Sequence, residues 1–284
     1  MVGIALQPED VFWRHNRALI EARAELFAVP PETPSTAGCA PGPGHERLLA
    51  FTRGAGRPVV GHGVLSSIGA VARPARRDAW LAALARDARA FGFAWLSEHL
   101  GFADAGDVHT AWPLPLPCTD DAASAVAASL RELRQACATV AFENNADLFC
   151  LGDPLRQPEL FHRICERADA HVLLDLHNAY AFCENAGCEF DAFLDRLPWP
   201  RVIELHLSGG SDSDPDLLAS GRRMRLDSHD GAVPDAVWRA FERALTRAGN
   251  LRAVVLEWFP DAMDEAAGRA FAADFERARS IVGG

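Results

Sequence analysis

Six apolar segments of this sequence end in a histidine or a carboxylate, side chains that can bind metal ions or transfer protons. The segments are VVGHG around His62, AWLSEHLGF around His99, VAFENN around Glu143, LLDLHN around Asp175, IELHLSGG around His206 and VVLEWF around Glu257. A seventh segment, LDSHDG, contains Asp227 and His229. Imidazoles and carboxylates that are buried together need a compensating charge. If these segments meet in space, we expect them to hold a cluster of metal ions.

A structural role is the alternative for each residue taken singly. One histidine at a strand end is commonly a half-buried ring that hydrogen-bonds to a neighbour. One aspartate or glutamate there can form a salt bridge or cap a helix. The repetition of such endings along the chain favours the metal hypothesis, because independent coincidences would have to accumulate at the same place.

The alternation of side chains along a strand predicts which residues share a face. The residues expected in phase are Val60 with His62, Trp95 with Ser97 and His99, Ala141 with Glu143, Leu173 with Asp175, Glu204 with His206, and Val255 with Glu257. Glu98 should point to the opposite face from His99. Each strand is thus expected to be apolar on its inner face until the last inward position, where a candidate ligand stands.

Apolar runs alternate with helical stretches rich in Ala, Leu and Arg, which is typical of βα units around a parallel sheet. Strands are expected near 3–7, 25–29, 58–64, 92–98, 138–143, 171–176, 202–207 and 252–258, and the clearest helices at 76–91, 120–136, 155–168, 189–196, 234–248 and 264–281. Eight strands predict closure into a (β/α)8 TIM barrel, with residues 1–284 forming a single domain.

Three long connections follow strands rather than helices. They lie near 30–46, 101–118 and 209–225, and are rich in Pro and Gly or carry aromatic residues. Active sites of such barrels are built on the face where the strands end. We therefore expect these connections to lie beside the site, as candidate lids.

Composition limits the classes of partner and compartment. The chain has 284 residues and a formal charge of -11. This charge argues against nucleic acid as a partner, because proteins that bind nucleic acid normally have a basic patch. The N-terminus lacks the features of a signal peptide, and no stretch of about 18 apolar residues could span a membrane. Seven scattered cysteines without C-x-x-C pairs indicate reduced thiols. We expect a cytoplasmic protein.

The ligand types favour iron over zinc or iron–sulfur chemistry. Neutral imidazole together with carboxylate oxygen suits ferrous and ferric iron, whereas thiolates favour the other two, and no cysteine stands at these strand ends. Carboxylates such as Glu143 and Glu257 can bridge two ions and reduce their mutual repulsion.

The motifs G-H-G-V-L-S, S-E-H-L, L-P-L-P, E-N-N, L-D-x-x-N, H-L-S-G-G, D-S-H and L-E-W occur in this order over roughly residues 58–260. In this order they resemble the family called domain of unknown function 692, which includes MbnB and TglH. The resemblance implies a TIM barrel similar to xylose isomerase and endonuclease IV, two or three iron ions of mixed Fe(II)/Fe(III) state, and dioxygen as co-substrate. It also implies oxidative modification, usually at cysteine, of a ribosomally made precursor peptide, with a small partner protein for leader recognition.

The resemblance further implies three neighbouring metal sites. The first has His62, His99 and Glu143, the second has Glu143 with Asp175, His206 and Glu257, and the third has Asn178, Asp227 and His229. Glu143, Asp175, His206 and Glu257 would carry the catalytic role. Family members often have Asn where this chain has His177, so His177, Asn178 or both could reach the third ion.

Several neighbouring residues have more than one possible role. Ser97, Asn144, Asn145 and Glu204 are placed to orient ligands by hydrogen bonds, although Asn144 and Asn145 could instead cap the following turn. Gly209 and Gly210 favour a tight exit from the preceding strand, with phosphate binding as the weaker alternative. Arg222, Arg223 and Arg225 could attract an acidic peptide or a terminal carboxylate, or could be solvated loop charges.

Two other functions compete with the oxidative one. A hydrolase or isomerase would use zinc, manganese or magnesium in the same barrel to activate water or polarise a sugar. A non-catalytic barrel would only bind a partner or store metal. Metal analysis separates the first from the iron enzyme, and substitution of Glu143 or His206 tests the second.

Overall fold

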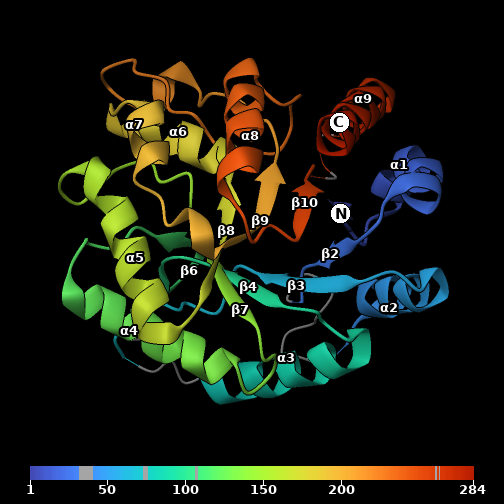
Figure 1. Ribbon diagram of the computed structural model, residues 1–284, viewed down its shortest axis with the longest axis horizontal. Coiled ribbons are helices and arrows are strands. Elements are labelled where there is room, and N and C mark those ends of the chain that lie inside the picture. The colour runs from blue at the N-terminus through green and yellow to red at the C-terminus, as the bar shows by residue number, and fades with distance from the viewer. Residues whose placement is uncertain (32–40, 73–75, 106–107, 260, 262) are drawn as a thin grey trace.

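Short apolar strands form the centre of the fold and amphipathic helices surround them (Figure 1). The computed structural model describes residues 1–31, 41–72, 76–105, 108–259, 261 and 263–284. Within these residues, eight parallel strands close a barrel in the order β1-β10-β9-β8-β7-β4-β3-β2. They are β1 (Val2–Ala5), β2 (Phe27–Val29), β3 (Val59–Gly63), β4 (Leu96–His99), β7 (Val140–Glu143), β8 (His171–Asp175), β9 (Val202–Leu207) and β10 (Ala253–Leu256). The predicted single-domain TIM barrel is confirmed.

The described helices cover the outside of the barrel. They are α1 (Asp10–Arg23), α2 (Pro43–Ala55), α3 (Arg77–Phe91), α4 (Asp120–Leu133), α5 (Gln157–Ala168), α6 (Leu176–Ala186), α7 (Phe190–Asp195), α8 (Asp235–Arg247) and α9 (Glu265–Gly283), with short 3-10 turns η1 (Pro154–Arg156), η2 (Trp199–Arg201) and η3 (Pro215–Leu217). The six predicted helices are confirmed to within a few residues. Sequence patterns did not identify α1, α2 or α6. No described helix has the length and apolar character needed to cross a bilayer.

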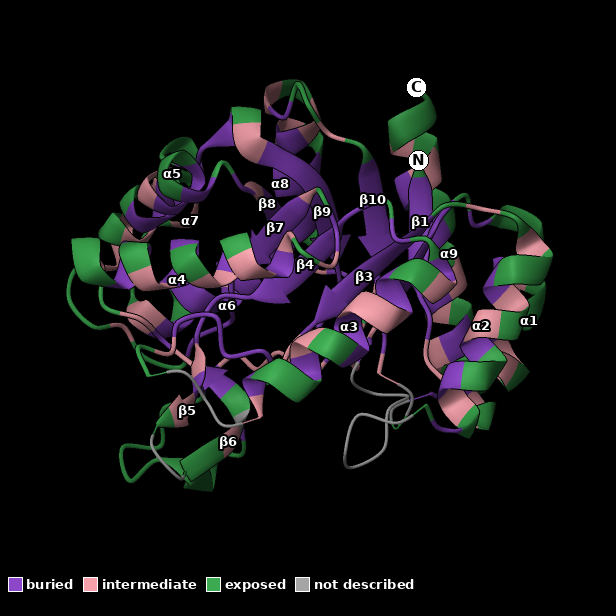
Figure 2. Cartoon of the chain, turned by 90° about the horizontal axis from the view of Figure 1, so that it is seen from below, coloured by how far each residue is buried: buried purple, intermediate pink, exposed green. Residues whose placement is uncertain are grey.

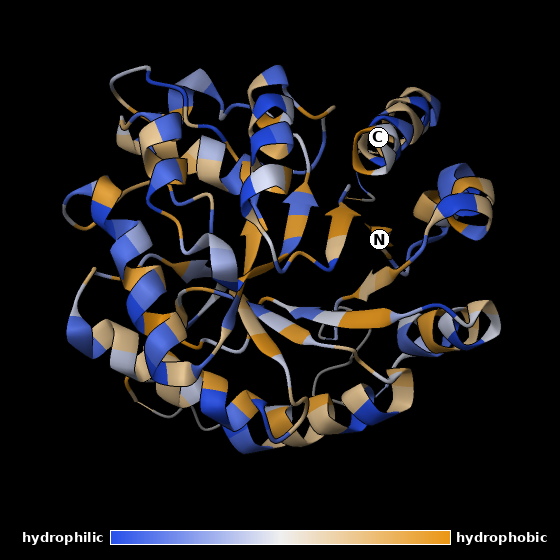
Figure 3. Ribbon diagram, viewed as in Figure 1, coloured by the Kyte–Doolittle hydropathy of each residue, from blue (hydrophilic) through white to orange (hydrophobic). Residues whose placement is uncertain are grey.

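The core has two parts because strand side chains alternate between two faces. A large cluster fills the space between the barrel and the helices, and it includes Phe12, Phe142 and Phe241. A smaller cluster lies inside the barrel and comprises Ala5, Leu26, Ala28, Val60, Trp95, Ala141, Leu173, Ile203, Ala253 and Val255. Figure 3 shows the apolar character of the central strands against the mixed faces of the helices. The inner cluster contains the apolar inward residues predicted from alternation, which are Val60, Trp95, Ala141, Leu173 and Val255. It also contains Ile203, which alternation did not predict, because a register shift between β8 and β9 leaves Ile203 as an extra residue.

Regular structure occurs in the described parts of the three long connections. Residues 32–40 of the predicted loop 30–46 lie outside the described residues, and α2 already begins at Pro43, a residue that favours the first turn of a helix. The second connection contains an antiparallel hairpin, β5 (Phe102–Ala105) and β6 (Val108–Leu114), which Figure 2 shows projecting from the barrel. The third is closed by a bridge between Asp212 and Arg225.

Candidate metal centre

Strand register places the candidate ligands beside one another at the carboxyl end of the barrel. His99 stands opposite Glu143 between β4 and β7, and Asp175 stands opposite His206 between β8 and β9. Four groups of ligand atoms lie within 4.8 Å of one another: His62, His99 and Glu143; His62, His206 and Glu257; Glu143, Asp175 and His206; and Asp175, His229 and Glu257. The groups share members, so the side chains form one continuous centre suited to more than one ion.

Glu143 lies between three of the imidazoles. Its Oε2 is 3.1 Å from Nε2 of His62 and 2.7 Å from Nε2 of His99. Its Oε1 is 3.6 Å from Nδ1 of His206. The carboxylate is 1 % exposed. A carboxylate that faces different partners with its two oxygens has the geometry of a bridging ligand.

The outer ring nitrogens of His62 and His99 are held by oxygen atoms. Nδ1 of His62 lies 2.9 Å from Oγ of Ser97, whose hydroxyl donates to the Gly61 carbonyl. Nδ1 of His99 lies 2.9 Å from Oδ1 of Asn145, whose amide nitrogen donates to the Leu100 carbonyl. Both oxygens therefore accept a hydrogen bond from the N–H group at Nδ1. In the neutral ring this leaves Nε2 as a lone pair directed at the centre.

His206 and His229 are arranged in the same way with their nitrogens exchanged. Nε2 of His206 is 3.2 Å from Oε1 of Glu204, and Nε2 of His229 contacts Oδ1 of Asp227. Their Nδ1 atoms face Glu257, at 3.4 Å and 3.2 Å from its Oε2. Each outer nitrogen has a carboxylate acceptor, so each inner nitrogen is free to coordinate, which is the usual support of metal-bound histidine.

Buried polar atoms without a hydrogen-bond partner test whether a cation fits here. Among the described residues, Oδ2 of Asp175 and Oδ1 of Asn178 are buried and accept no hydrogen bond. Nδ1 of His206 and Nδ1 of His229 likewise lack one. Such atoms are costly to bury unless something else satisfies them. All four are of atom types that can bind a metal ion, and the donor set of imidazole nitrogen and carboxylate or amide oxygen fits iron or a similar divalent ion.

The pKa values show how strongly the centre attracts positive charge. Burial opposes the charging of His99, but the Glu143 carboxylate outweighs it and raises the pKa of His99 to about 10. Burial also opposes ionisation of Glu257, yet His206 helps to lower the pKa of Glu257 to about 2. Burial, followed by repulsion from Glu143, raises the pKa of Asp175 to about 8. His99 and Asp175 therefore hold protons firmly at the place where a bound cation would compensate the same negative charge.

Asp175 has two structural tasks besides facing the centre. Its Oδ1 accepts a hydrogen bond of 2.7 Å from the backbone N–H of Asn178 and so caps α6. Its backbone N–H donates to Oδ1 of Asn144, and Nδ2 of Asn144 donates to its carbonyl. Asn144 therefore fixes the strand end of Asp175, while Asn145 orients His99. The predicted orienting roles of Ser97, Asn144, Asn145 and Glu204 agree with these contacts.

A close backbone contact positions the loop that carries Asp227 and His229. A Cβ atom at Gly209 would lie 2.2 Å from the Ala232 carbonyl oxygen, and one at Gly210 would lie 2.3 Å from that of Leu226. His229 has the left-handed φ of 44°, and its ring stacks on Phe259 at 4.6 Å between centroids. The glycines thus let the loop approach β9, in agreement with the predicted tight exit.

The predicted third site stays a prediction, and two of its candidate residues have partners within the chain. Asp227 contacts Nε2 of His229, on the side of the ring away from Glu257, and so stands behind the ring as seen from Glu257. His177 belongs to none of the four described ligand groups and accepts a hydrogen bond of 3.3 Å from Nε of Arg225. Burial lowers the pKa of His177 to about 4. Arg222 donates to the carbonyl groups of Glu184 and Asn185 rather than standing free in solvent.

Two tryptophans escaped the sequence analysis as parts of the site. Nε1 of Trp95 donates a 2.7 Å hydrogen bond to Oε2 of Glu204, which locks the carboxylate that holds His206. The Trp112 ring lies 6.0 Å from the His99 ring, between centroids. The phase of Trp95 with His99 was a usable signal, and for Trp112 the signal was its position in the connection 101–118, which was expected beside the site.

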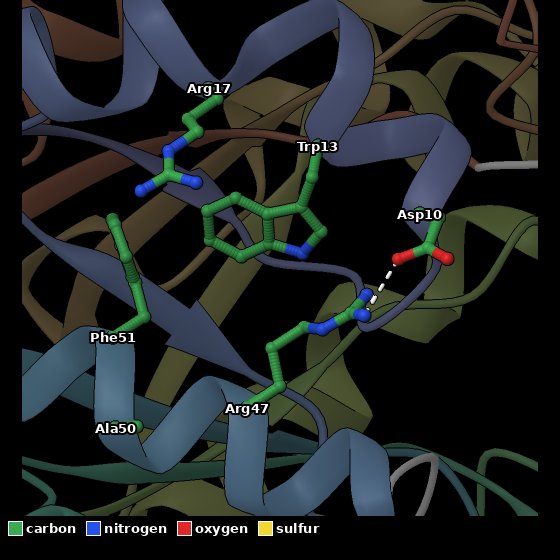
Figure 4. A pocket seen from close by; sticks show the side chains of 6 residues that line it. All are labelled: Asp10, Trp13, Arg17, Arg47, Ala50 and Phe51. Carbon is green, nitrogen blue, oxygen red and sulfur yellow. Dashed lines mark ion pairs between the residues drawn. The ribbon is translucent and has the colours of Figure 1, made fainter.

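A separate cavity of about 380 Å³ lies between α1 and α2 (Figure 4). Trp13 and Phe51 line it, with ring centroids 4.7 Å apart. Its arginines already form ion pairs, Arg47 with Asp10 at 2.6 Å and Arg17 with Glu21 at 2.8 Å. It contains none of the candidate ligands.

Comparison with known proteins identifies the class. The sequence model of the family described as "RiPP precursor modification enzyme MbnB/TglH/ChrH", where RiPP denotes a ribosomally synthesised and post-translationally modified peptide, matches residues 3–282. The chain therefore belongs to this family, as its motifs predicted. It is 31% identical over 205 residues to a UPF0276 protein of Anaeromyxobacter sp. (strain Fw109-5), covering 71% of this chain and 68% of the relative.

Solved structures share the fold. A xylose isomerase domain containing protein from Salmonella typhimurium superposes with a TM-score of 0.57 at 17% identity, covering 100% of this chain and 97% of the other. Endonuclease IV from Thermus thermophilus gives a TM-score of 0.55 at 17% identity, covering 99% and 98%. These structures support the xylose isomerase-like TIM barrel.

Proposed function

We propose that this protein is a multinuclear iron-dependent oxidative enzyme that uses dioxygen to modify a residue, cysteine in our proposal, of a ribosomally synthesised precursor peptide. Family membership supports the peptide substrate. The observation that carries the metal chemistry is the convergence of four imidazoles, each with its outer nitrogen facing an oxygen acceptor and its inner nitrogen facing a carboxylate.

The residues of the chain would divide the work among themselves. The proposed ligands are His62, His99, Glu143, Asp175, Asn178, His206, Asp227, His229 and Glu257, with Asp227 joining by a change of its contact with His229. When bound, two or three iron ions would supply the redox chemistry with dioxygen. Glu143 and Glu257 would hold neighbouring ions together, and Asp175 and His206 would complete the coordination between them. The buried walls would limit the access of water.

A small partner protein for the leader peptide and a cytoplasmic location complete the proposal. The described chain forms one barrel, without a separate unit for leader recognition. The sequence contains no lysine, so an isomerase reaction that relies on a lysine ammonium to polarise a carbonyl is not available to this chain.

The test is to load the purified chain with Fe(II) without oxygen, count the metal, and add air together with small peptides encoded near its gene. We expect more than one iron per chain and a change in peptide mass that requires dioxygen. Glu143→Ala should abolish the mass change, whereas Leu217→Ala, on an exposed loop, should preserve it. An unchanged mass for every peptide at full iron loading would refute the proposal.

A further inference from the structure

A cavity of about 330 Å³ opens beside the candidate metal centre. Trp112 and Leu114 of the β6 segment, Leu148 and Phe149 of the loop after β7, and Leu226 and Asp227 are among the residues that line it. Asp227 contacts His229, and the Trp112 ring lies 6.0 Å from that of His99. Two residues that line the cavity therefore lie next to histidines of the centre.

Exposed apolar side chains gather at this cavity. Trp112 is 41% exposed, Leu148 43% and Phe149 50%, although large hydrophobic side chains normally avoid solvent. They come from two separate loops on the carboxyl face of the barrel, so packing within one element does not account for their grouping. Grouped exposed apolar side chains are typical of surfaces that bind another molecule.

The size and lining of the cavity define its occupant. Its volume is at the small end of ligand sites, which suits one side chain better than a large cofactor. A sugar would require several polar partners, whereas the walls are mainly aromatic, aliphatic and proline side chains. The loop that carries Leu148 and Phe149 follows Glu143 by a few residues, and Asp227 on another wall contacts His229. A peptide with one residue at the centre could therefore place a neighbouring side chain here.

We propose that this cavity is a specificity subsite that takes an apolar side chain adjacent to the modified residue of the substrate peptide. The inference rests on the proposed function, since it assumes a peptide substrate. Beyond that function, it specifies that the peptide must have an apolar residue next to the modified residue. The proposed occupant is a side chain of the substrate peptide, and the alternative that the test must exclude is a partner protein that covers the same surface.

The test measures binding without turnover. The chain is loaded with redox-inert Zn(II) and titrated calorimetrically with Ac-Gly-Gly-Cys-X-Gly-Gly-NH2 and with Ac-Gly-Gly-X-Cys-Gly-Gly-NH2, where X is Gly, Asp, Leu or Phe. We expect Leu or Phe on one side of the cysteine to bind about tenfold more tightly than Gly or Asp, from burial of the apolar side chain.

Two variants separate a subsite from a general change in the protein. Leu148→Arg should reverse the order so that the Asp peptide binds more tightly than the Leu peptide. Leu217→Arg places the same charge on an exposed leucine that does not line the cavity, and should leave the order unchanged. Zinc content and circular dichroism confirm that each variant is folded and loaded.

The opposite results are distinguishable. Equal affinities for all X on both sides, no measurable binding of any peptide, or the same shift in both variants would overturn the subsite. A partner protein as the true occupant would also give no dependence on X. A clear preference for Leu or Phe without any dioxygen-dependent mass change would retain the subsite and refute the oxidative reaction instead. Turnover of a natural peptide without such a preference would retain the oxidative reaction and refute the subsite.

Discussion

Replacement of Glu204 by glutamine tests the arrangement of the centre with almost no change in volume. Glu204 is 0% exposed and accepts two hydrogen bonds, 2.7 Å from Nε1 of Trp95 and 3.2 Å from Nε2 of His206. A glutamine has only one oxygen. If that oxygen continues to accept from Trp95, its NH2 group faces His206, whose Nε2 must then accept, and the proton moves to Nδ1.

This exchange of tautomer directs a proton at the place where a cation would bind. We expect Glu204→Gln to lower metal affinity by roughly 10–100-fold, the range found for residues that support metal ligands, which corresponds to about 1.4–2.7 kcal/mol. Glu204→Ala removes both acceptors. It should also destabilise the metal-free fold by about 2–6 kcal/mol, since each of two buried donors loses its partner at roughly 1–3 kcal/mol.

Chelator competition measures the affinity, and thermal unfolding of the metal-free chain measures the stability. Trp95→Phe is the matched control, because it removes the other donor to Glu204 and leaves the acceptor of His206 in place. It should retain metal affinity better than Glu204→Gln does. If Glu204→Gln binds metal within about twofold of the wild type, a threshold well below the roughly 10-fold minimum for such residues, the inferred tautomer of His206 and its role as a ligand are wrong.

Three further predictions concern other parts of the structure. Asp175→Asn should lose bound metal but keep the cap of α6, because the asparagine side chain retains one oxygen. Asp175→Ala should lose both the metal and the cap, with a fall of about 1 kcal/mol in the free energy of unfolding. Metal counts and urea unfolding measure these effects, and equal stability of the two variants would contradict the prediction. Gly210→Ala should displace the 226–232 loop and reduce metal content, because its Cβ would lie 2.3 Å from the Leu226 carbonyl oxygen. Gly54→Ala lies in α2, where a Cβ meets open space, and should raise the free energy of unfolding by about 0.5–1 kcal/mol. Similar behaviour of the two alanine variants would argue against the close contact at Gly210. Burial raises the pKa of Asp147 to about 8, so the folded chain holds this proton more firmly than the unfolded chain; the resulting stability is full below the ordinary carboxyl pKa and is lost as pH rises to about 8. Asp147→Asn should therefore melt at a higher temperature than the wild type at pH 9 and show a smaller difference at pH 5, and a constant difference would contradict the buried, protonated state.

The sequence predicted the barrel because its two periodicities are local. Alternation along a strand and the helical repeat can both be read from neighbouring residues, so the inward set from Val60 to Val255 and the six clearest helices were identified correctly. The helix α6 was missed because LDLHN, which ends β8 and begins α6, was interpreted only as a source of candidate ligands. The helix α1 was missed although Phe12, Asn16 and Ile20 form a buried stripe at helical spacing.

The candidate ligands were also within reach of the sequence. Parallel strands all end at one rim of a barrel, so a histidine or carboxylate at the last inward position of several strands must converge with the others. The sequence gives both the type of each residue and, through alternation along the strand, the face on which its side chain lies. The sequence therefore predicts that six side chains meet at this rim, and the structure brings them together there: His62, His99, Glu143, Asp175, His206 and Glu257. Their use as metal ligands stays a prediction.

Only the tertiary structure decided which nitrogen of each ring faces the centre. That choice depends on contacts between residues up to 109 positions apart, such as Trp95 with Glu204, and on backbone approaches such as Gly210 to Leu226. It also placed Asp227 behind His229, turned His177 towards Arg225, and assembled Trp112, Leu148 and Phe149 around one cavity. Hydrogen-bond direction and loop packing arise from the three-dimensional meeting of distant segments, and periodicity along the chain contains no record of them.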